Sequence, residues 1–209
     1  MRGGVDGRTL RAEARRENRR SAILSAALRT FGDKGFHQTT VADIIDAAGI
    51  ARGTFYLYFE GKSAIFLELL DGLLAELRGS IVGVDREEGA PPLGVQLDII
   101  VHRVLHTVAD NRLLSTIIIR EAVGLGDEVD RRLRLFYQKL LRYIRLALDE
   151  GRRVGLLRAM DTEVAAICVL GSVKQLMEQY VMAEDDEFDV DRAAIGVLDY
   201  SLHGLLPSG

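Results

Sequence analysis

The sequence of 209 residues predicts an all-α protein with nine helices in two domains. Apolar residues recur at helical spacing along most of the chain, and no stretch alternates apolar and polar residues as a half-buried strand does. Glycines and prolines separate the periodic stretches, most clearly in GVDREEGAPPLG at 83–94.

Charge divides the chain into a basic start and an acidic remainder. Residues 1–62 hold 11 Lys and Arg against 7 Asp and Glu, a balance of +4, while the whole chain carries −4. Residues 63–209 therefore carry −8. This asymmetry indicates two domains with different tasks.

Composition places the chain among soluble globular proteins, with 48% apolar and 28% charged residues. No apolar run reaches the length of a membrane span, and no signal peptide is visible. The single Cys168 fits a reducing compartment. We therefore expect a cytoplasmic protein without membrane association.

Residues 1–16 are predicted to form a flexible basic arm. Seven arginines lie within the first twenty residues. Such a segment is either a solvated tail or an arm that binds phosphate groups, and its charged residues can also extend the first helix. An amphipathic helix pattern begins near Glu17 and ends at Gly35, which suits a left-handed cap. This helix opens a domain predicted over residues 17–62.

Two short helices are predicted next, over residues 41–48 and 52–58. Thr40 precedes the first helix and Asp43 follows three residues later, which is the spacing of a capping box with Asp in place of Glu or Gln. The first helix ends at Gly49, and a short turn leads into the second. Two short helices joined by a glycine-containing turn are a helix-turn-helix candidate.

The second short helix carries side chains suited to the major groove of DNA. Arg52 can donate to a guanine edge or a phosphate, Thr54 can contact either, and the hydroxyls of Tyr56 and Tyr58 can donate to phosphates. Gly53 leaves room for a close approach of DNA. Helical bundles that bind no DNA also contain short helix pairs, so spacing alone does not decide the function.

The detailed string of residues resembles the DNA-binding domain of the TetR (tetracycline-repressor) family of bacterial transcriptional regulators. The matching residues are Phe31, Gly35, Phe36, Thr39, Thr40, Ile44, Ala48, Gly49, Gly53, Thr54, Phe55, Tyr56, Tyr58, Phe59 and Lys62. The resemblance is close over residues 17–80. It implies a nine-helix, two-domain TetR-like fold, with an N-terminal three-helix helix-turn-helix domain and a C-terminal helical domain for ligand binding and dimerisation.

Carried over to this chain, the family pattern and the residue chemistry imply a set of DNA-binding positions. They are Thr40, Arg52, Gly53, Thr54, Tyr56, Tyr58 and Lys62. Three positions depart from the pattern. Ala51 replaces a frequent Ser and loses a helix cap worth about 1 kcal/mol. Leu57 replaces a position that is often polar, and Ser63 replaces a common Glu.

Six further helices are predicted in residues 63–209, which the resemblance assigns to effector binding and dimerisation. Their ranges are 63–82, 93–110, 111–123, 127–153, 161–183 and 190–206. In the family, the first four of these enclose an effector pocket, and mostly apolar walls here suit a small amphipathic or hydrophobic ligand. The expected pocket residues are Ile99, His102, His106, Thr116, Ile117, Phe136, Tyr137, Leu140 and Tyr143. The same apolar stripes are typical of a core, so only part of this set is expected to touch a ligand.

The last two predicted helices form the dimer interface in the family. The expected interface residues are Ala165, Cys168, Val169, Ser172 and Leu176 on one helix and Ala194, Val197, Leu198, Ser201 and Leu205 on the other. These stripes would serve equally as core within one chain.

The sequence indicates neither an enzyme nor a cofactor. His102 and His106 have the i, i+4 spacing of metal ligands, but Arg103 breaks the HExxH pattern and neither Cys nor a third His lies near, so no metal site is predicted. The chain has no Glu-x-x-His pair, phosphate-binding glycine loop, G-x-S-x-G elbow or CxxC.

The expected function is that of a ligand-responsive homodimeric repressor. It would bind double-stranded operator DNA and leave it when a small amphipathic or hydrophobic effector moves the helix over 63–82 and changes the spacing of the two recognition helices. The alternatives are a helical protein–protein adaptor and a helical-bundle enzyme.

Overall fold

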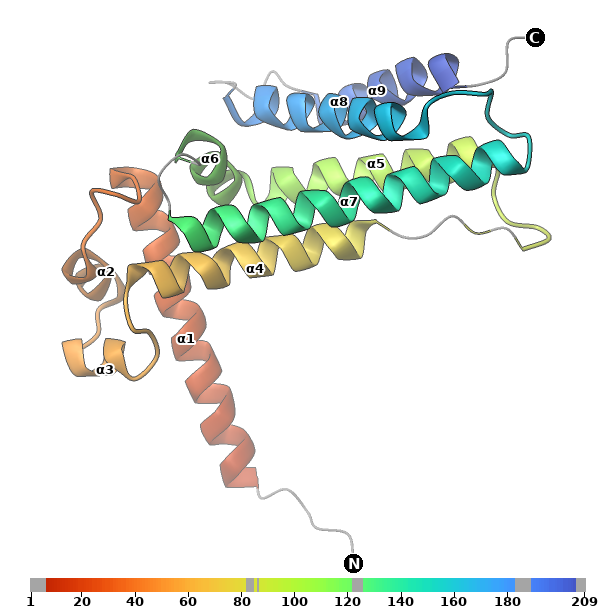
Figure 1. Ribbon diagram of the computed structural model, residues 1–209. Helices are drawn as coiled ribbons and strands as arrows, with labels where there is room; N and C mark the ends of the chain where they lie inside the picture. Colours follow the sequence, from red (N-terminus) through yellow and green to blue (C-terminus); the bar gives the residue numbers. More distant parts are fainter. Residues whose placement is uncertain (1–6, 82–84, 86, 122–125, 183–188, 206–209) are drawn as a thin grey trace, which may run out of the picture. The chain divides into compact units, whose positions relative to one another are not determined.

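The computed structural model describes residues 7–81, 85, 87–121, 126–182 and 189–205, which form nine α-helices and no strand (Figure 1). The helices are α1 (Gly7–Lys34), α2 (Val41–Ala48), α3 (Arg52–Tyr56), α4 (Lys62–Ser80), α5 (Leu93–Asp110), α6 (Arg112–Glu121), α7 (Asp127–Arg153), α8 (Thr162–Met182) and α9 (Val190–Leu205). The predicted all-α fold is confirmed. None of the described helices is long and apolar enough to cross a membrane.

The chain divides into two compact units, Met1–Gly72 and Leu73–Gly209. This division falls inside α4, and not after Lys62 where the sequence predicts the domain boundary. The first turns of α4 belong to the aromatic core of the first unit, because the Phe66 ring lies 5.1 Å from the Phe36 ring. The first unit therefore extends beyond the helix-turn-helix itself.

α1 begins at Gly7, well before Glu17 where its start is predicted. Arg, Ala and Glu are frequent in residues 7–16 and have high helix propensity, so the helix continues without an apolar stripe. The side chains of residues 9–19 are exposed. The helix over residues 7–16 agrees with the alternative that these charged residues extend the first helix, and residues 1–6 lie outside the described part of the chain.

α2 begins and ends as predicted. The Thr40 hydroxyl accepts from the Asp43 N–H at 3.2 Å, and the Asp43 carboxylate accepts from the Thr40 N–H at 2.8 Å, which completes the capping box. Gly49 closes the helix with φ 61°, a left-handed conformation that favours glycine. α3 ends at Tyr56 and not at residue 58. Ala51 provides no side-chain cap for α3, as its identity predicts.

An ion pair joins the two long helices of the first unit. Arg20 on α1 donates from Nε to Oε1 of Glu68 on α4 at 2.7 Å. The Arg20 guanidinium also lies 4.6 Å from the centre of the Phe59 ring. Beneath these contacts, the buried core of the unit includes Ile23, Ala27, Phe31, Phe36, Ile44, Phe55, Phe59, Ile65, Phe66 and Leu70.

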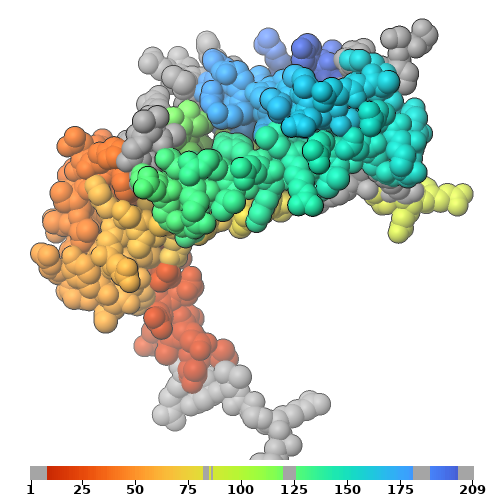
Figure 2. All heavy atoms as spheres, in the orientation of Figure 1, coloured from red at the N-terminus to blue at the C-terminus, as the bar shows by residue number. Residues whose placement is uncertain are grey.

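In the second unit, α5 packs against α9, and α7 packs against α8. Figure 2 shows α8, in blue, lying along α7, in green to teal. α5 and α7 have the predicted bounds, and α6 ends at Glu121, with the predicted end at 123 outside the described residues. Aspartates cap the last two helices. Asp161 Oδ1 accepts from the Val164 N–H at 3.1 Å, and Asp189 Oδ1 accepts from the Arg192 N–H at 2.9 Å.

Candidate nucleic-acid interface and ligand cavity

The outer side of α2 and α3 brings together most of the residues expected to bind DNA. Thr40, Arg52, Gly53 and Tyr56 are exposed, and Thr54 and Tyr58 are half-buried. α3 turns its opposite side inward, where Phe55 is fully buried. The short helix therefore separates a packing face from a polar face.

Arg52 and Tyr56 lie one turn apart on the outer face of α3. The guanidinium carbon of Arg52 lies 5.8 Å from the centre of the Tyr56 ring, which is within the range of a cation–π contact. This contact orients both side chains while leaving the guanidinium exposed. Arg52 can therefore donate to a base edge or to a phosphate.

Gly53 is not required by the packing or by the backbone of α3. A Cβ added there would meet no atom within 4 Å, and the φ of Gly53 is not in the left-handed region. Glycine inside a helix costs about 1 kcal/mol relative to alanine. No contact within the described part of the chain therefore accounts for the glycine.

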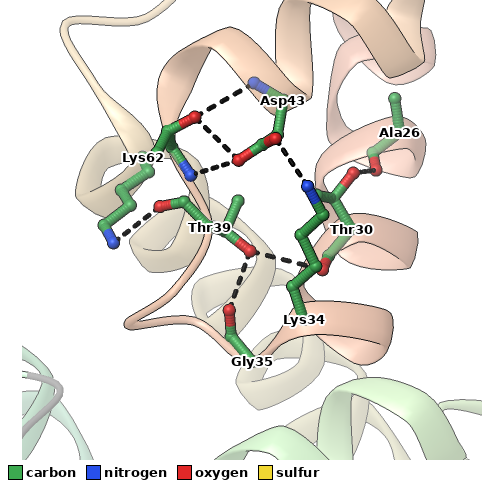
Figure 3. Close-up of polar contacts among 8 residues, drawn as sticks. Ala26, Thr30, Lys34, Gly35, Thr39, Asp43 and Lys62 are labelled. Atoms are coloured by element: carbon green, nitrogen blue, oxygen red, sulfur yellow. Dashed lines mark hydrogen bonds and ion pairs between the residues drawn. The ribbon is translucent and has the colours of Figure 1, made fainter.

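The start of α2 is held by a chain of polar contacts (Figure 3). Lys34 donates to Asp43 Oδ1 at 2.6 Å, and the Thr40 hydroxyl donates to Asp43 Oδ2 at 2.7 Å. The bond from Lys34, followed by those from the Thr40 hydroxyl and N–H, keeps the pKa of the Asp43 carboxyl well below its usual range. Because the Thr40 hydroxyl proton is directed at Asp43, Thr40 must turn it outward before it can donate to a phosphate.

Lys62 lies against the chain between α1 and α2. Its ammonium donates to the carbonyl oxygens of Phe36 at 2.8 Å, His37 at 3.0 Å and Thr39 at 2.8 Å. Figure 3 shows the bond to Thr39. An ammonium group has three N–H donors, so all of them are used. The structure therefore gives Lys62 a structural role, and the expected phosphate contact stays a prediction.

Leu57 was not among the predicted site residues, although it lies next to them. It follows the last residue of α3 and is 75% exposed. An exposed apolar side chain beside Arg52 and Tyr56 can contact the methyl group of a thymine. The departure of Leu57 from the family pattern was the sequence signal for this position.

A separate feature of the second unit is a cavity of about 910 Å³. Its apolar walls include Leu97, Ile100, Val101 and Val104 of α5, Leu140, Ile144 and Ala147 of α7, Val169, Leu170 and Val173 of α8, and Val197 and Leu198 of α9. Lys62–Ser80 of α4 contributes no residue to the described lining. The size and the apolar walls are typical of a small-molecule site.

Two of the predicted pocket residues, Leu140 and Tyr143, line this cavity. The others lie outside its lining and are Ile99, His102, His106, Thr116, Ile117, Phe136 and Tyr137. The physical reason is the rotation of the helices. α5 turns Leu97 and Val101 to the cavity, which leaves Ile99 exposed. Ile117 and Phe136 are buried outside the lining.

The predicted pocket histidines instead connect α5 to the first turn of α9. His106 Nε2 lies 2.9 Å from Asp191 Oδ1, and His102 Nε2 lies 3.8 Å from the same oxygen. His102 Nδ1 lies 2.9 Å from the backbone oxygen of Asp98, one turn earlier. The two histidines therefore form a polar link between helices.

Half of the ten predicted dimer-interface residues line the cavity or are buried within the chain. Val169, Val197, Leu198 and Ser201 line the cavity, and Ala194 is fully buried. Ala165, Ser172 and Leu176 are half-buried, and Cys168 is exposed. The side chain of Leu205 lies outside the described part. α9 thus turns its part of the expected stripe toward the interior of its own unit, and the α8 part is half-buried or exposed.

The opposite faces of α8 and α9 carry apolar side chains that the described chain leaves uncovered. Val164 and Ile167 of α8 are each 54% exposed, and Ile195 and Tyr200 of α9 are 59% and 75% exposed. Cys168 lies on the same face of α8. We call the exposed sides that these five residues mark the outer α8–α9 face; Ile195 and Tyr200, five residues apart, lie at its two edges on α9, about 140° apart around the helix.

Comparisons with known proteins agree with this architecture. Residues 23–69 match the family of bacterial regulatory proteins, tetR family. The chain is 26% identical over 193 residues to the HTH-type transcriptional regulator YdgC of Bacillus subtilis, covering 91% of this chain and 94% of YdgC. It is 29% identical over 185 residues to the HTH-type transcriptional regulator AcrR of Shigella flexneri, covering 84% and 83%.

A solved structure extends the likeness to the fold. The TetR-family transcriptional regulator from Syntrophomonas wolfei is 25% identical, with a TM-score of 0.69, covering 89% of this chain and 94% of that one. The fold and the exposed helix pair define a helix-turn-helix transcriptional regulator. The matched domain, the two relatives and this solved structure together support a TetR-family transcriptional regulator, a class of proteins that are not enzymes.

Proposed function

We propose that this TetR-family regulator is a homodimeric repressor that binds operator DNA in the cytoplasm and leaves it when a small hydrophobic or amphipathic effector enters the cavity of the second unit. The observation that carries the proposal is that α8 and α9 each present one face to the cavity and another to the surface. Their inner faces line a ligand-sized cavity, and their outer faces are apolar and exposed.

The α2–α3 surface of each protomer is the proposed DNA-binding site. Arg52, Thr54 and Tyr56 would enter the major groove, with Gly53 permitting a close approach. Thr40 and Tyr58 would bind phosphates on either side. Because one such surface covers little DNA, two protomers related by a two-fold axis would bind half-sites about one helical turn apart.

The outer α8–α9 face is the proposed dimer interface, and its occupant is a second copy of this chain. Large apolar side chains gathered on two adjacent helices favour removal from water. Gly171 and Gly196 are exposed on these helices, and a Cβ added to either would meet no atom within 4 Å. Both glycines therefore permit close packing of a partner helix, and a two-fold axis would make the contact self-complementary.

The cavity and the proposed interface share two helices, which supplies a route of coupling. A ligand that contacts Val169, Val173 and Val197 presses on the inner faces of α8 and α9. A small shift of either helix would alter the arrangement of the two protomers and the spacing of their recognition helices. This route replaces the expected direct displacement of α4. A ligand that releases DNA must favour the non-binding arrangement by about 1–3 kcal/mol.

The test of the proposal is a DNA-binding titration with a fragment from upstream of the protein's own gene at low salt. We expect a retarded complex with a two-fold footprint, and its loss when a cavity ligand is added. A protein that binds no fragment but pulls down a specific protein partner would favour the adaptor alternative and overturn the repressor function.

A further inference from the structure

Among the described residues, those with a charge at the cavity of the second unit are all acidic. Apolar side chains form most of its lining, and the charged residues among those described are Asp85, Glu87 and Glu150. No Lys, Arg or His belongs to the described lining. A polar end of a ligand at the described part of this wall therefore meets negative charge or uncharged groups.

Asp85 and Glu87 are held at the cavity by Gln96 near the start of α5. The Gln96 side chain accepts from the Asp85 N–H at 2.7 Å and donates to the Asp85 carbonyl oxygen at 2.9 Å and to that of Pro91 at 2.7 Å. Asp85 Oδ1 accepts from the Glu87 N–H at 3.0 Å. These hydrogen bonds fix the backbone of both acidic residues beside the first turn of α5.

Glu150 contributes less negative charge to the cavity. Arg153 donates to its two carboxylate oxygens at 2.7 and 2.6 Å, which offsets the charge. Asp85 and Glu87 are exposed, and neither forms an ion pair with another residue in the described part of the chain. Among the described residues, these two carboxylates set the charge at this end of the site, and Arg86, which lies between them in the sequence, is outside the described part of the chain.

We propose that the effector of this cavity is a hydrophobic molecule with a cationic or neutral polar end, and that Asp85 and Glu87 select against an anionic end. This inference rests on the effector site proposed above and specifies its ligand class. Walls from α5, α7, α8 and α9 would hold the apolar body of the ligand. An anionic end would lose water at the cavity, find no cation in the described lining and be repelled by two carboxylates.

Three probes with the same alkyl chain test the charge preference, namely decyltrimethylammonium, decanol and decanoate. Their affinities are measured with the full-length protein at low salt, by displacement of the neutral dye Nile red. We expect the cation to bind about tenfold more tightly than the carboxylate, with the alcohol between them. Decanoate binding as tightly as the cation would overturn the inference while leaving the effector site intact.

Matched variants assign the preference to these residues. Asp85→Asn together with Glu87→Gln keeps the size and the oxygen acceptors, and should bring the cation and carboxylate affinities within about threefold of each other. Glu88→Gln changes an exposed neighbour outside the lining and should keep the wild-type ratio. A double variant that retains the full preference would overturn the role of Asp85 and Glu87.

A cavity-filling variant separates this inference from the proposed function. Ala147 lines the cavity, so Ala147→Leu should weaken all three probes. If it weakens none of them, the probes bind elsewhere and the inference is wrong. If no probe binds the wild-type protein and none changes its retention of DNA, the effector part of the proposed function fails together with the inference.

Discussion

Lys62 donates from its ammonium to the carbonyl oxygen of Thr39 at 2.8 Å, and this bond joins the first turn of α4 to the residue before the cap of α2. The same ammonium donates two more hydrogen bonds, to the carbonyl oxygens of Phe36 and His37. A side chain that the family pattern assigns to a phosphate thus holds the helix-turn-helix against its supporting helix. Measurements of stability and of DNA binding can therefore distinguish the structural role of Lys62 from a phosphate contact.

Replacing Lys62 by alanine should lower the free energy of unfolding by about 1–3 kcal/mol, because three carbonyl oxygens lose a charged donor. The salt dependence of DNA binding should stay unchanged. Chemical denaturation and titrations at several salt concentrations measure the two effects. Arg29→Ala, at an exposed basic position on α1, is the matched control. A flatter salt slope at unchanged stability would restore the phosphate contact.

Arg52→Ala should weaken specific operator binding by about 1–3 kcal/mol, because a guanidinium that reads a base edge supplies energy of this order. Its exposed position predicts little change in stability. Fluorescence anisotropy with operator and scrambled DNA measures the difference. Equal losses on both sequences would make Arg52 a phosphate contact, and no loss would remove it from the site.

Gly53→Ala should keep or raise the stability of the folded protein, by up to about 1 kcal/mol, since the added methyl group meets no atom and alanine favours a helix. The same substitution should weaken DNA binding if the backbone of α3 approaches the DNA. Thermal unfolding and a DNA titration are the two readouts. Gly72→Ala, also in open space on a helix, should leave DNA binding unchanged; equal behaviour of the two variants would refute a close approach at Gly53.

Asp43 should contribute stability that depends on pH. Its folded pKa is depressed below the ordinary 3.8, first by Lys34 and then by Thr40, so the stabilisation is present above that value and is lost as the pH falls below it. Asp43→Asn should flatten the stability profile between about pH 4 and pH 2. Acid titration of the free energy of unfolding measures this, and an unchanged profile would show that the Lys34 bond does not persist in solution.

Ile167→Asp together with Tyr200→Asp should convert the proposed dimer into a folded monomer, because both side chains are exposed on the outer α8–α9 face. The expected consequence is loss of operator binding with little loss of helix content. Sedimentation velocity and circular dichroism measure these effects. Leu135→Asp, at an exposed apolar position on α7, should leave the association state unchanged. A double variant that sediments as the wild-type protein does would place any dimer contact elsewhere.

The sequence by itself determined the helices and the class of protein. Helical periodicity and the glycine, proline and aspartate signals predicted the described helices α2, α5, α7, α8 and α9 closely. Thr40 and Asp43 predicted the capping box. These features depend on residues close together in the chain, so local rules reach them. The start of α1 at Gly7 was not predicted, because a segment with helix propensity but without an apolar stripe shows no helical periodicity.

Only the tertiary structure decided which face of each helix points inward. α8 contains the nearly continuous apolar run VAAICVLGSV, so its pattern does not distinguish Val169, at the cavity, from Ile167, on the outer face. On α5 likewise, the cavity is lined by Ile100 and not by its neighbour Ile99, which is a difference of one position around the helix. The role of Lys62 depends on carbonyl groups more than twenty residues away in the chain, and backbone groups are the same for every residue type. No local sequence pattern can therefore predict that contact.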